Sequence, residues 1–84
     1  MHDFRRLIAW QKANAFEVRM QSIVDRMTRQ RPALSDQLER SCGSIAANIA
    51  EGYSKKRYPK MFVSKMIDAD GEATETQVWL DFCS

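Results

Sequence analysis

A short stretch beyond the middle of the chain combines positive charge with aromatic rings. Lys55, Lys56 and Arg57 are consecutive, and Tyr53 and Tyr58 flank them. Cations neutralise phosphates and aromatic rings stack on unpaired bases, so the stretch predicts a nucleic-acid-binding loop. A lysine-rich loop that is only solvated has the same composition, and this second interpretation stays open. Further cations could extend the patch: Lys60, Arg5, Arg6, Lys12, Arg19 and Arg26.

No set of residues in the chain predicts catalysis. The chain has one histidine, His2, which alone cannot anchor a metal site or a triad. Asp68, Glu72 and Glu75 form an acidic row on one helix face, but the Glu-x-x-His pattern of di-iron bundles is absent. The row is more simply a solvated face or half of an ion-pair seam. Glycine-rich phosphate loops are also missing. We therefore expect no enzyme activity, no metal and no cofactor.

Charge is distributed unevenly along the 84 residues, although the net charge is only +2. Residues 1–40 carry a net +3, residues 41–65 a net +4 and residues 66–84 a net −5. Such asymmetry is typical of a nucleic-acid-binding face or of subunits that pair head to tail. An uneven solvated surface is the alternative.

The length and composition predict a single small domain inside the cell. Apolar residues make up 44% of the chain and charged residues 29%, as in ordinary globular proteins. No apolar run is long enough to span a membrane, and the N-terminus does not resemble a signal peptide. The two cysteines form no CxxC pair, so we expect reduced thiols and a cytoplasmic location.

Hydrophobic spacing predicts an all-α fold of three long helices, at about residues 4–28, 35–51 and 59–83. Apolar residues recur at alternating steps of four and three in the first and third segments, which is helical periodicity. Asp3 and Ser35 are predicted N-caps, Pro59 suits the first helical position, and Gly52 suits the position after a helix end. The middle helix is rich in small residues, and Gly43 within it favours close packing over simple helix propensity.

Two apolar regions predict contacts outside a three-helix core. Trp10 lies off the main apolar stripe of the first helix, either on a second contact surface or at the margin of the core. The end of the third helix is apolar on nearly every side, which normally means burial on every side. We therefore expect Trp10, Val78, Trp79 and Phe82 to contact another helix or another subunit.

Asn48 and Glu51 lie three residues apart, just before Gly52, and so neighbour each other on the second helix. They could satisfy the unpaired backbone groups at adjoining helix ends. A ligand site is the less favoured alternative.

One nine-residue segment resembles a family signature. Residues 44–52, SIAANIAEG, closely match the S-I-[PA]-A-N-I-A-E-G motif of the ribosomal RNA intervening-sequence protein family. Residues 3–13 resemble its opening D-F-x-x-L-x-V-W-Q-K-A, Gln37 to Arg40 its Q-x-x-R, and Ala69-x-Gly71 with Glu75 the start of its third helix.

The resemblance implies an antiparallel up-down bundle that assembles into a homo-oligomeric ring, pentameric in relatives. The family carries four helices, and we expect this chain to lack the fourth. A related protein, the accessory protein of diversity-generating retroelements, binds nucleic acid through basic surfaces and partners a reverse transcriptase. The leading hypothesis is therefore a ring-forming, non-enzymatic protein that binds RNA or DNA, accessory to a reverse transcriptase. The alternative is a protein-interaction module of unknown function that binds no nucleic acid.

Overall fold

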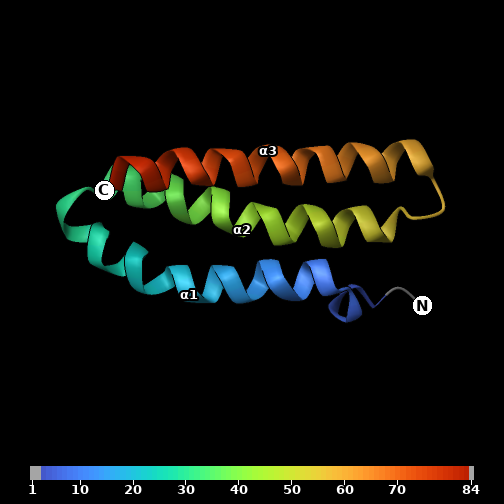
Figure 1. Ribbon diagram of the computed structural model, residues 1–84, viewed down its shortest axis with the longest axis horizontal. Helices are drawn as coiled ribbons and strands as arrows, with labels where there is room; N and C mark the ends of the chain where they lie inside the picture. Colours follow the sequence, from blue (N-terminus) through green and yellow to red (C-terminus); the bar gives the residue numbers. More distant parts are fainter. Residues whose placement is uncertain (1–2, 84) are drawn as a thin grey trace.

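Three long helices lie side by side in the computed structural model, which describes residues 3–83 (Figure 1). A 3-10 turn, η1 (Phe4–Arg6), precedes α1 (Ile8–Gln30), α2 (Pro32–Ser54) and α3 (Pro59–Cys83). Successive helices run antiparallel, and the molecule measures 44 × 21 × 15 Å (Figure 1). The predicted all-α, up-down class is confirmed over the described residues.

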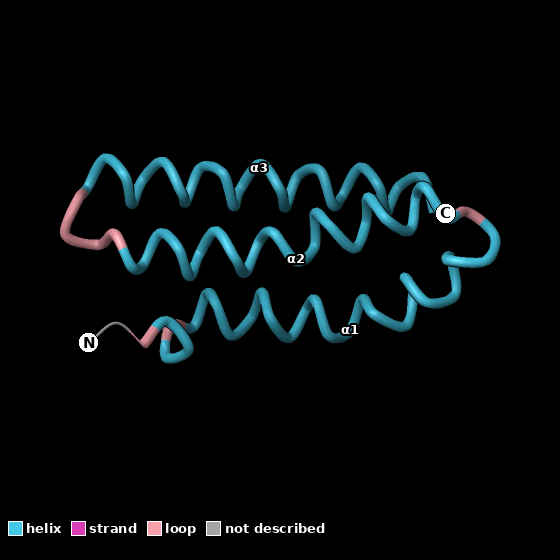
Figure 2. The backbone as a smooth tube through the Cα atoms, turned by 180° about the vertical axis from the view of Figure 1, so that it is seen from behind, coloured by secondary structure: helices cyan, strands magenta, loops and turns pink. Residues whose placement is uncertain are grey.

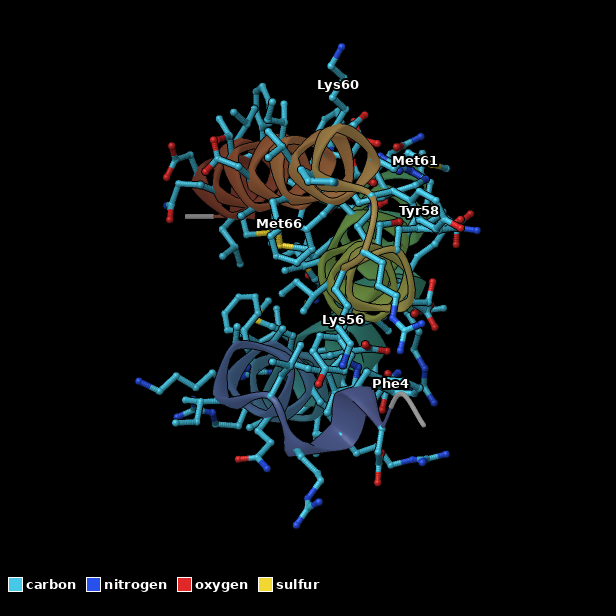
Figure 3. The ribbon with its side chains drawn as sticks, turned by 90° about the vertical axis from the view of Figure 1, so that its right-hand side faces the viewer. Phe4, Lys56, Tyr58, Lys60, Met61 and Met66 are labelled. Atoms are coloured by element: carbon cyan, nitrogen blue, oxygen red, sulfur yellow. The ribbon has the colours of Figure 1, made fainter. Side chains whose placement is uncertain are left out.

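Helix α2 is the central element. It packs against both α1 and α3, whereas no Cα atom of α1 comes within 8 Å of one in α3 (Figure 2). Viewed along the helices, α1 and α3 lie on either side of α2 (Figure 3). The described chain is therefore an open, V-shaped arrangement with α2 at its apex (Figure 3). Helices α1 and α3 meet through side chains at the end of α3, where Cys83 Sγ lies 3.0 Å from Met27 Sδ.

The core consists of two clusters along α2. Near the α2–α3 turn the cluster is made of small residues together with one isoleucine: Ala13, Ala46, Ile49 and Ala69. Near the α1–α2 link the buried side chains are larger: Met20, Val24, Leu38 and Cys42. Small residues of all three helices are buried together in the first cluster. Close packing does not require Gly43, however, since a Cβ there would meet only the Glu17 carboxylate, at 3.5 Å.

The link between α1 and α2 is shorter than the sequence predicted. Helix α2 begins at Pro32 instead of Ser35, because proline is already set for the first helical position and its missing N–H costs nothing there. Ser35 is consequently inside the helix and buried, and it is not an N-cap. Its hydroxyl donates to the carbonyl of Val24 (3.0 Å) and lies 3.1 Å from Thr28 Oγ1, so it joins α2 to α1.

At the end of the bundle that holds the α2–α3 turn, the start of α1 and the end of α2 also differ from the expected bounds. Asp3 is an N-cap as predicted, since its Oδ1 accepts from the N–H of Arg5 (3.1 Å), but it caps η1. Leu7 is extended, and α1 starts at Ile8. Helix α2 continues past Gly52 to Ser54, and Gly52 has no positive φ, so the predicted role of Gly52 as a C-cap is wrong.

A buried pair of hydroxyls joins α2 to α3. Thr76 Oγ1 lies 2.9 Å from Ser41 Oγ, and Ser41 donates to the carbonyl of Leu38 (3.3 Å). Replacing Thr76 with valine keeps the shape and removes this partner. We expect the free energy of unfolding, measured by urea denaturation, to fall by about 1 kcal/mol, the usual net contribution of one hydrogen bond, because Ser41 keeps its bond to the carbonyl of Leu38.

The matched control for this change is Thr74→Val, because Thr74 is exposed on the same helix and its hydroxyl bonds only to the carbonyl of Asp70. The control should shift stability by less than about 0.5 kcal/mol, as for most surface changes. Equal effects of the two variants would show that the Ser41–Thr76 contact contributes nothing specific.

Candidate nucleic-acid interface

The fold gathers the predicted basic residues at one end of the bundle. Helix α1 begins, α2 ends and α3 begins at this end (Figure 1). Three of the cations are in the α2–α3 turn, and one is in the first turn of α3. Two more are in η1, and the last is in the second turn of α1. We call this set the basic end; it comprises Lys55, Lys56, Arg57, Lys60, Arg5, Arg6 and Lys12.

Backbone hydrogen bonds fix the turn that carries three of these cations. The N–H of Lys55 donates to Gly52 O (2.9 Å), that of Lys56 to Tyr53 O (3.1 Å), and that of Tyr58 to Lys55 O (2.8 Å). Lys56 and Arg57 are exposed, and Lys55 is half-buried. The side chains of Lys56 and Arg57 therefore extend into solvent from a backbone that is held by hydrogen bonds.

The two tyrosines of the turn differ in accessibility. The ammonium of Lys56 lies 4.3 Å from the ring centroid of Tyr53 and 3.1 Å from its hydroxyl, so this ring already has a cation over one face. Tyr58 is 62% exposed and lies at the outer edge of the turn (Figure 3). Of the two rings predicted to stack on bases, Tyr58 is the one that is open to a ligand.

The cations of η1 are placed by local aromatic packing. The Arg5 guanidinium lies 5.0 Å from the Phe4 ring centroid and pairs with Asp3 (3.2 Å), while Phe4 packs edge-on against Trp10 at 5.2 Å. Gln11 donates to the carbonyl of Arg5 (2.9 Å), which ties η1 to α1. Because η1 also contacts α2, it lies at the same end of the bundle as the α2–α3 turn.

Arg19 and Arg26 lie outside the basic end. They are exposed, two and four turns further along α1, toward the opposite end of the bundle. The suggested extension of the patch along the whole of α1 therefore does not form a single cluster.

The signature residues Asn48 and Glu51 lie within α2, Glu51 in its last turn, and within residues 3–83 neither side chain bonds to a backbone group at a helix end, so the structure does not support a capping role. The Asn48 side chain donates to the carbonyl of Ser44 (2.8 Å), and Glu51 pairs with Lys65 of α3 (3.2 Å). At Gly52 α2 and α3 approach closely, since a Cβ there would overlap Met66 Cε and lie 3.0 Å from Lys65 Cβ. Glu51 and Gly52 therefore serve the α2–α3 contact, whereas the hydrogen bond of Asn48 lies within α2.

Arg40 and Glu75 form a second contact between the same helices. Arg40 pairs with Glu72 (3.0 Å) and with Glu75, and Glu75 also accepts from the Trp79 indole N–H (3.1 Å). Glu72 belongs to the acidic row for which an ion-pair seam was one of two interpretations, but the sequence did not identify Arg40 as its partner. Two members of the acidic row are thus half of an ion-pair seam. Residues 3–83 contain no group of three or more His, Cys, Asp or Glu side chains placed to hold a metal.

This seam predicts a pH dependence of stability. Hydrogen bonds from Trp79 and Arg40 lower the pKa of Glu75 below its ordinary value near 4.5. A carboxyl whose pKa is lower in the folded state stabilises the fold above its unfolded pKa, and this contribution is lost as pH falls through the folded pKa. We expect the melting temperature to fall below about pH 4.5.

Glu75→Gln tests that dependence, because it keeps the shape and removes the titrating group. Its melting temperature should vary less than that of the wild type between pH 6 and pH 3, by circular dichroism, while the control Glu39→Gln, at an exposed site on α2, should follow the wild type. Parallel curves for Glu75→Gln and wild type would contradict the assignment.

Cys42 does not provide a reactive group. Burial, together with the charge of Glu17, raises the pKa of the Cys42 thiol to about 11. A thiol in that environment stays protonated at neutral pH and is a poor nucleophile.

The four predicted contact residues divide into two pairs. Trp10 and Trp79 are partly buried and pack against the two core clusters, at the margin of the core. Val78 and Phe82 are 45% and 55% exposed on the surface of α3. The structure therefore leaves Val78 and Phe82 available for a partner, whereas each tryptophan is largely used within the chain.

Comparison with known families identifies the group to which this chain belongs. The sequence profile of the 23S rRNA-intervening sequence protein family matches residues 5–84. The chain belongs to this family. The match covers nearly the whole length, including the basic end and both α2–α3 contacts, and agrees with the resemblance of residues 44–52. No curated protein and no solved structure matched the chain.

None of the helices described here has the length and apolar character needed to cross a membrane.

Proposed function

We propose that this protein is a non-enzymatic nucleic-acid-binding protein that holds the phosphate backbone of RNA or DNA with its basic end. The observation that carries the proposal is that seven cations, carried by η1, α1, the α2–α3 turn and α3, all belong to one end of the bundle. The cations of the basic end belong to residues 3–12 and 51–60, and these two described stretches contain only two acidic residues, Asp3 and Glu51. The excess positive charge favours a polyanion.

The mechanism is phosphate neutralisation without reading of base edges. Lysine and arginine side chains displace counterions from the backbone, so affinity falls as salt is raised. The exposed ring of Tyr58 can add stacking on an unpaired base, which tolerates any sequence. The name of the family refers to an intervening sequence in 23S rRNA, which makes structured RNA the first target to test.

We also propose that copies of the chain assemble into a ring and serve a reverse transcriptase, in the reducing environment of the cytoplasm. The resemblance to accessory proteins of retroelements supports the assembly, and the two free thiols are compatible with the compartment. The competing function is a protein-interaction module, favoured by the exposure of Val78 and Phe82.

Size-exclusion chromatography with light scattering, recorded at 260 and 280 nm, tests ring assembly and nucleic-acid binding in one experiment. We expect a mass several times the 9.7 kDa of one chain and an absorbance ratio raised by co-purified nucleic acid, which nuclease treatment and high salt remove. An oligomer with no nucleic acid, and no affinity for added RNA or DNA, would favour the interaction module. A clean monomer would contradict the ring.

A further inference from the structure

The exposed apolar side chains of the bundle lie mostly on its two outer helices. Of the eight large apolar side chains that are exposed within residues 3–83, two belong to α1 and five to α3, whereas α2 has none. Ile8 and Val18 of α1 are 68% and 66% exposed, and Ile67 of α3 is 64% exposed. Apolar side chains that gather on an exposed surface mark an interaction site.

These side chains belong to one face of each helix, on the side opposite the core. Buried residues of α1 (Ala13, Met20) and of α3 (Ala69, Thr76) are each flanked by exposed residues two positions before and after. Two positions turn about 200° around a helix, which is nearly the opposite side. We call the flanking residues the outer faces: Gln11, Ala15, Val18 and Ser22 on α1, and Ile67, Gly71, Thr74 and Val78 on α3.

The two outer faces are directed away from each other. Helices α1 and α3 lie on either side of α2 (Figure 3). Lys60, two turns before Ile67 on the same side of α3, projects away from both other helices (Figure 3). One chain can therefore contact one neighbour through α1 and another through α3. Such a contact between two different surfaces is heterologous, and its repetition produces a ring when the rotation closes.

The charges of the outer helices favour a contact between unlike faces. Helix α1 carries four basic and two acidic residues, and α3 carries two basic and five acidic residues. Helix α1 of one copy and α3 of the next therefore have opposite net charges and attract each other. Two α3 helices, or two α1 helices, would repel each other.

The outer faces also match in level along the bundle. Helices α1 and α3 run in the same direction, since each is antiparallel to α2 (Figure 1). Ala13 and Ala69 share a core cluster, and Met27 Sδ lies 3.0 Å from Cys83 Sγ. The residue numbers of these two pairs differ by the same amount, so α1 and α3 keep one register along their length. The same difference matches the outer faces one to one: Gln11 with Ile67, Ala15 with Gly71, Val18 with Thr74, and Ser22 with Val78.

We propose that neighbouring copies of this chain join through the outer face of α1 in one copy and the outer face of α3 in the next, with the two helices parallel and Ala15 against Gly71. The proposal rests on the ring assembly proposed above and names the surfaces that form it. In a ring whose axis runs along the helices, neighbouring copies lie at one level, so the matched residues meet.

Small residues at the centre of this contact allow the helices to approach closely. Apart from the backbone of its own helix, no atom of residues 3–83 lies within 4 Å of the position that a Cβ of Gly71 would take, and Gly71 has no positive φ. Nothing within the chain therefore requires glycine there, although glycine is unfavourable inside a helix. A missing side chain opposite Ala15 lets a second helix come near, and Ile67 and Val78 pack to either side of it.

The contact leaves the basic end open to nucleic acid. Helix α3 extends further than α1 at that end of the bundle, so Lys60 lies beyond the contact (Figure 1). Because all copies point in the same direction, the ring places every basic end at one rim. The rim concentrates positive charge, which strengthens its attraction for a polyanion.

Disulfide trapping tests the pairing of Ala15 with Gly71. The variant carries Ala15→Cys and Gly71→Cys in a Cys83→Ser background, which leaves only the buried Cys42 as a native thiol. No Cα atom of α1 lies within 8 Å of one in α3, and a disulfide spans about 7 Å at most, so a bond between the new thiols joins two chains. Mild oxidation should give a ladder of covalent oligomers on a non-reducing gel.

Three controls identify a heterologous contact. Either single-cysteine variant should stay monomeric on the gel, because equivalent residues of neighbouring copies lie far apart in a ring. A mixture of the two single variants should stop at a covalent dimer. The matched pair Ala47→Cys with Gly71→Cys should form no ladder, because Ala47 is an exposed alanine on α2, outside both outer faces.

Variants that block one face test the same contact without crosslinking. Val18→Asp blocks the face of α1 and Ile67→Asp that of α3, because each places a charge in the contact. Each variant alone should have the mass of one chain by light scattering, with the helical circular dichroism of the wild type. An equimolar mixture should form a heterodimer through the two remaining faces. Both should bind a short RNA oligonucleotide within a few fold of the wild type, since neither residue belongs to the basic end.

Three results would overturn this interface: an oligomer in which the cysteines at 15 and 71 form no ladder, self-crosslinking of Gly71→Cys alone, or a ladder of equal strength from the control pair. A ring that binds RNA but gives any of these results retains the proposed function with another contact. A ladder from a protein with no RNA affinity would support the interface and contradict the nucleic-acid function. A monomer at all concentrations would contradict the ring and this interface together.

Discussion

Replacing Lys55, Lys56 and Arg57 together with alanine is expected to weaken binding to RNA about a hundredfold at ~0.1 M salt, because each phosphate contact contributes through counterion release. The slope of log affinity against log salt should fall by about 2–3, since each contact adds about 0.7–0.9. Fluorescence anisotropy with a labelled oligonucleotide, titrated over a range of salt, measures both quantities.

The control for this triple variant removes the same charge elsewhere. Arg19, Arg26 and Arg29 are exposed on α1 beyond the basic end, so Arg19→Ala, Arg26→Ala and Arg29→Ala together change the net charge equally. Their loss should reduce affinity by only a few fold, through long-range attraction that salt screens. If both triple variants lose affinity equally, net charge governs binding and the basic end is not the interface.

That the residues of the basic end share one end of the bundle could be predicted in part from the sequence. Apolar steps of four and three placed Ala13 and Met20 on the buried side of one helix, and both are buried. Three antiparallel helices bring the start of the first beside the turn between the second and third, so Arg5 and Lys56 had to share one end. The sequence did not show which ring stays open, because this depends on side-chain placement: Lys56 lies over Tyr53, and Tyr58 is exposed.

The contacts that hold α2 were less predictable, because the residues that make them have more than one common role. A serine after a proline can cap a helix or pack inside it, and Ser35 packs inside because Pro32 already starts the helix. Arg40 finds its partners 32 and 35 residues away, on another helix. Periodicity places such residues on a face and does not identify the side chain opposite.

Gly52 shows the same ambiguity, and its replacement is expected to have the largest effect on stability. Glycine marks helix ends and close approaches alike, and here it lies inside α2 with Met66 and Lys65 of α3 packed over it. Gly52→Leu should lower the free energy of unfolding by about 3 kcal/mol, because the added carbons force the two helices apart. For a domain of this size that corresponds to a fall in melting temperature of roughly 12–24 °C, measured by circular dichroism or calorimetry.

A size series at the same position distinguishes close approach from capping. If Gly52 were needed for a left-handed backbone, alanine and leucine would cost about the same, because any Cβ is strained there. Close approach instead predicts that Gly52→Ala costs clearly less than Gly52→Leu, since the flexible end of Met66 can move away from a single methyl group.

The control is Gly43→Ala in the same helix, where a Cβ would meet only the Glu17 carboxylate at 3.5 Å. That variant should gain up to about 1 kcal/mol from helix propensity alone. Stabilisation at position 43 together with a size-dependent loss at position 52 requires that α2 and α3 touch through the glycine of the family signature.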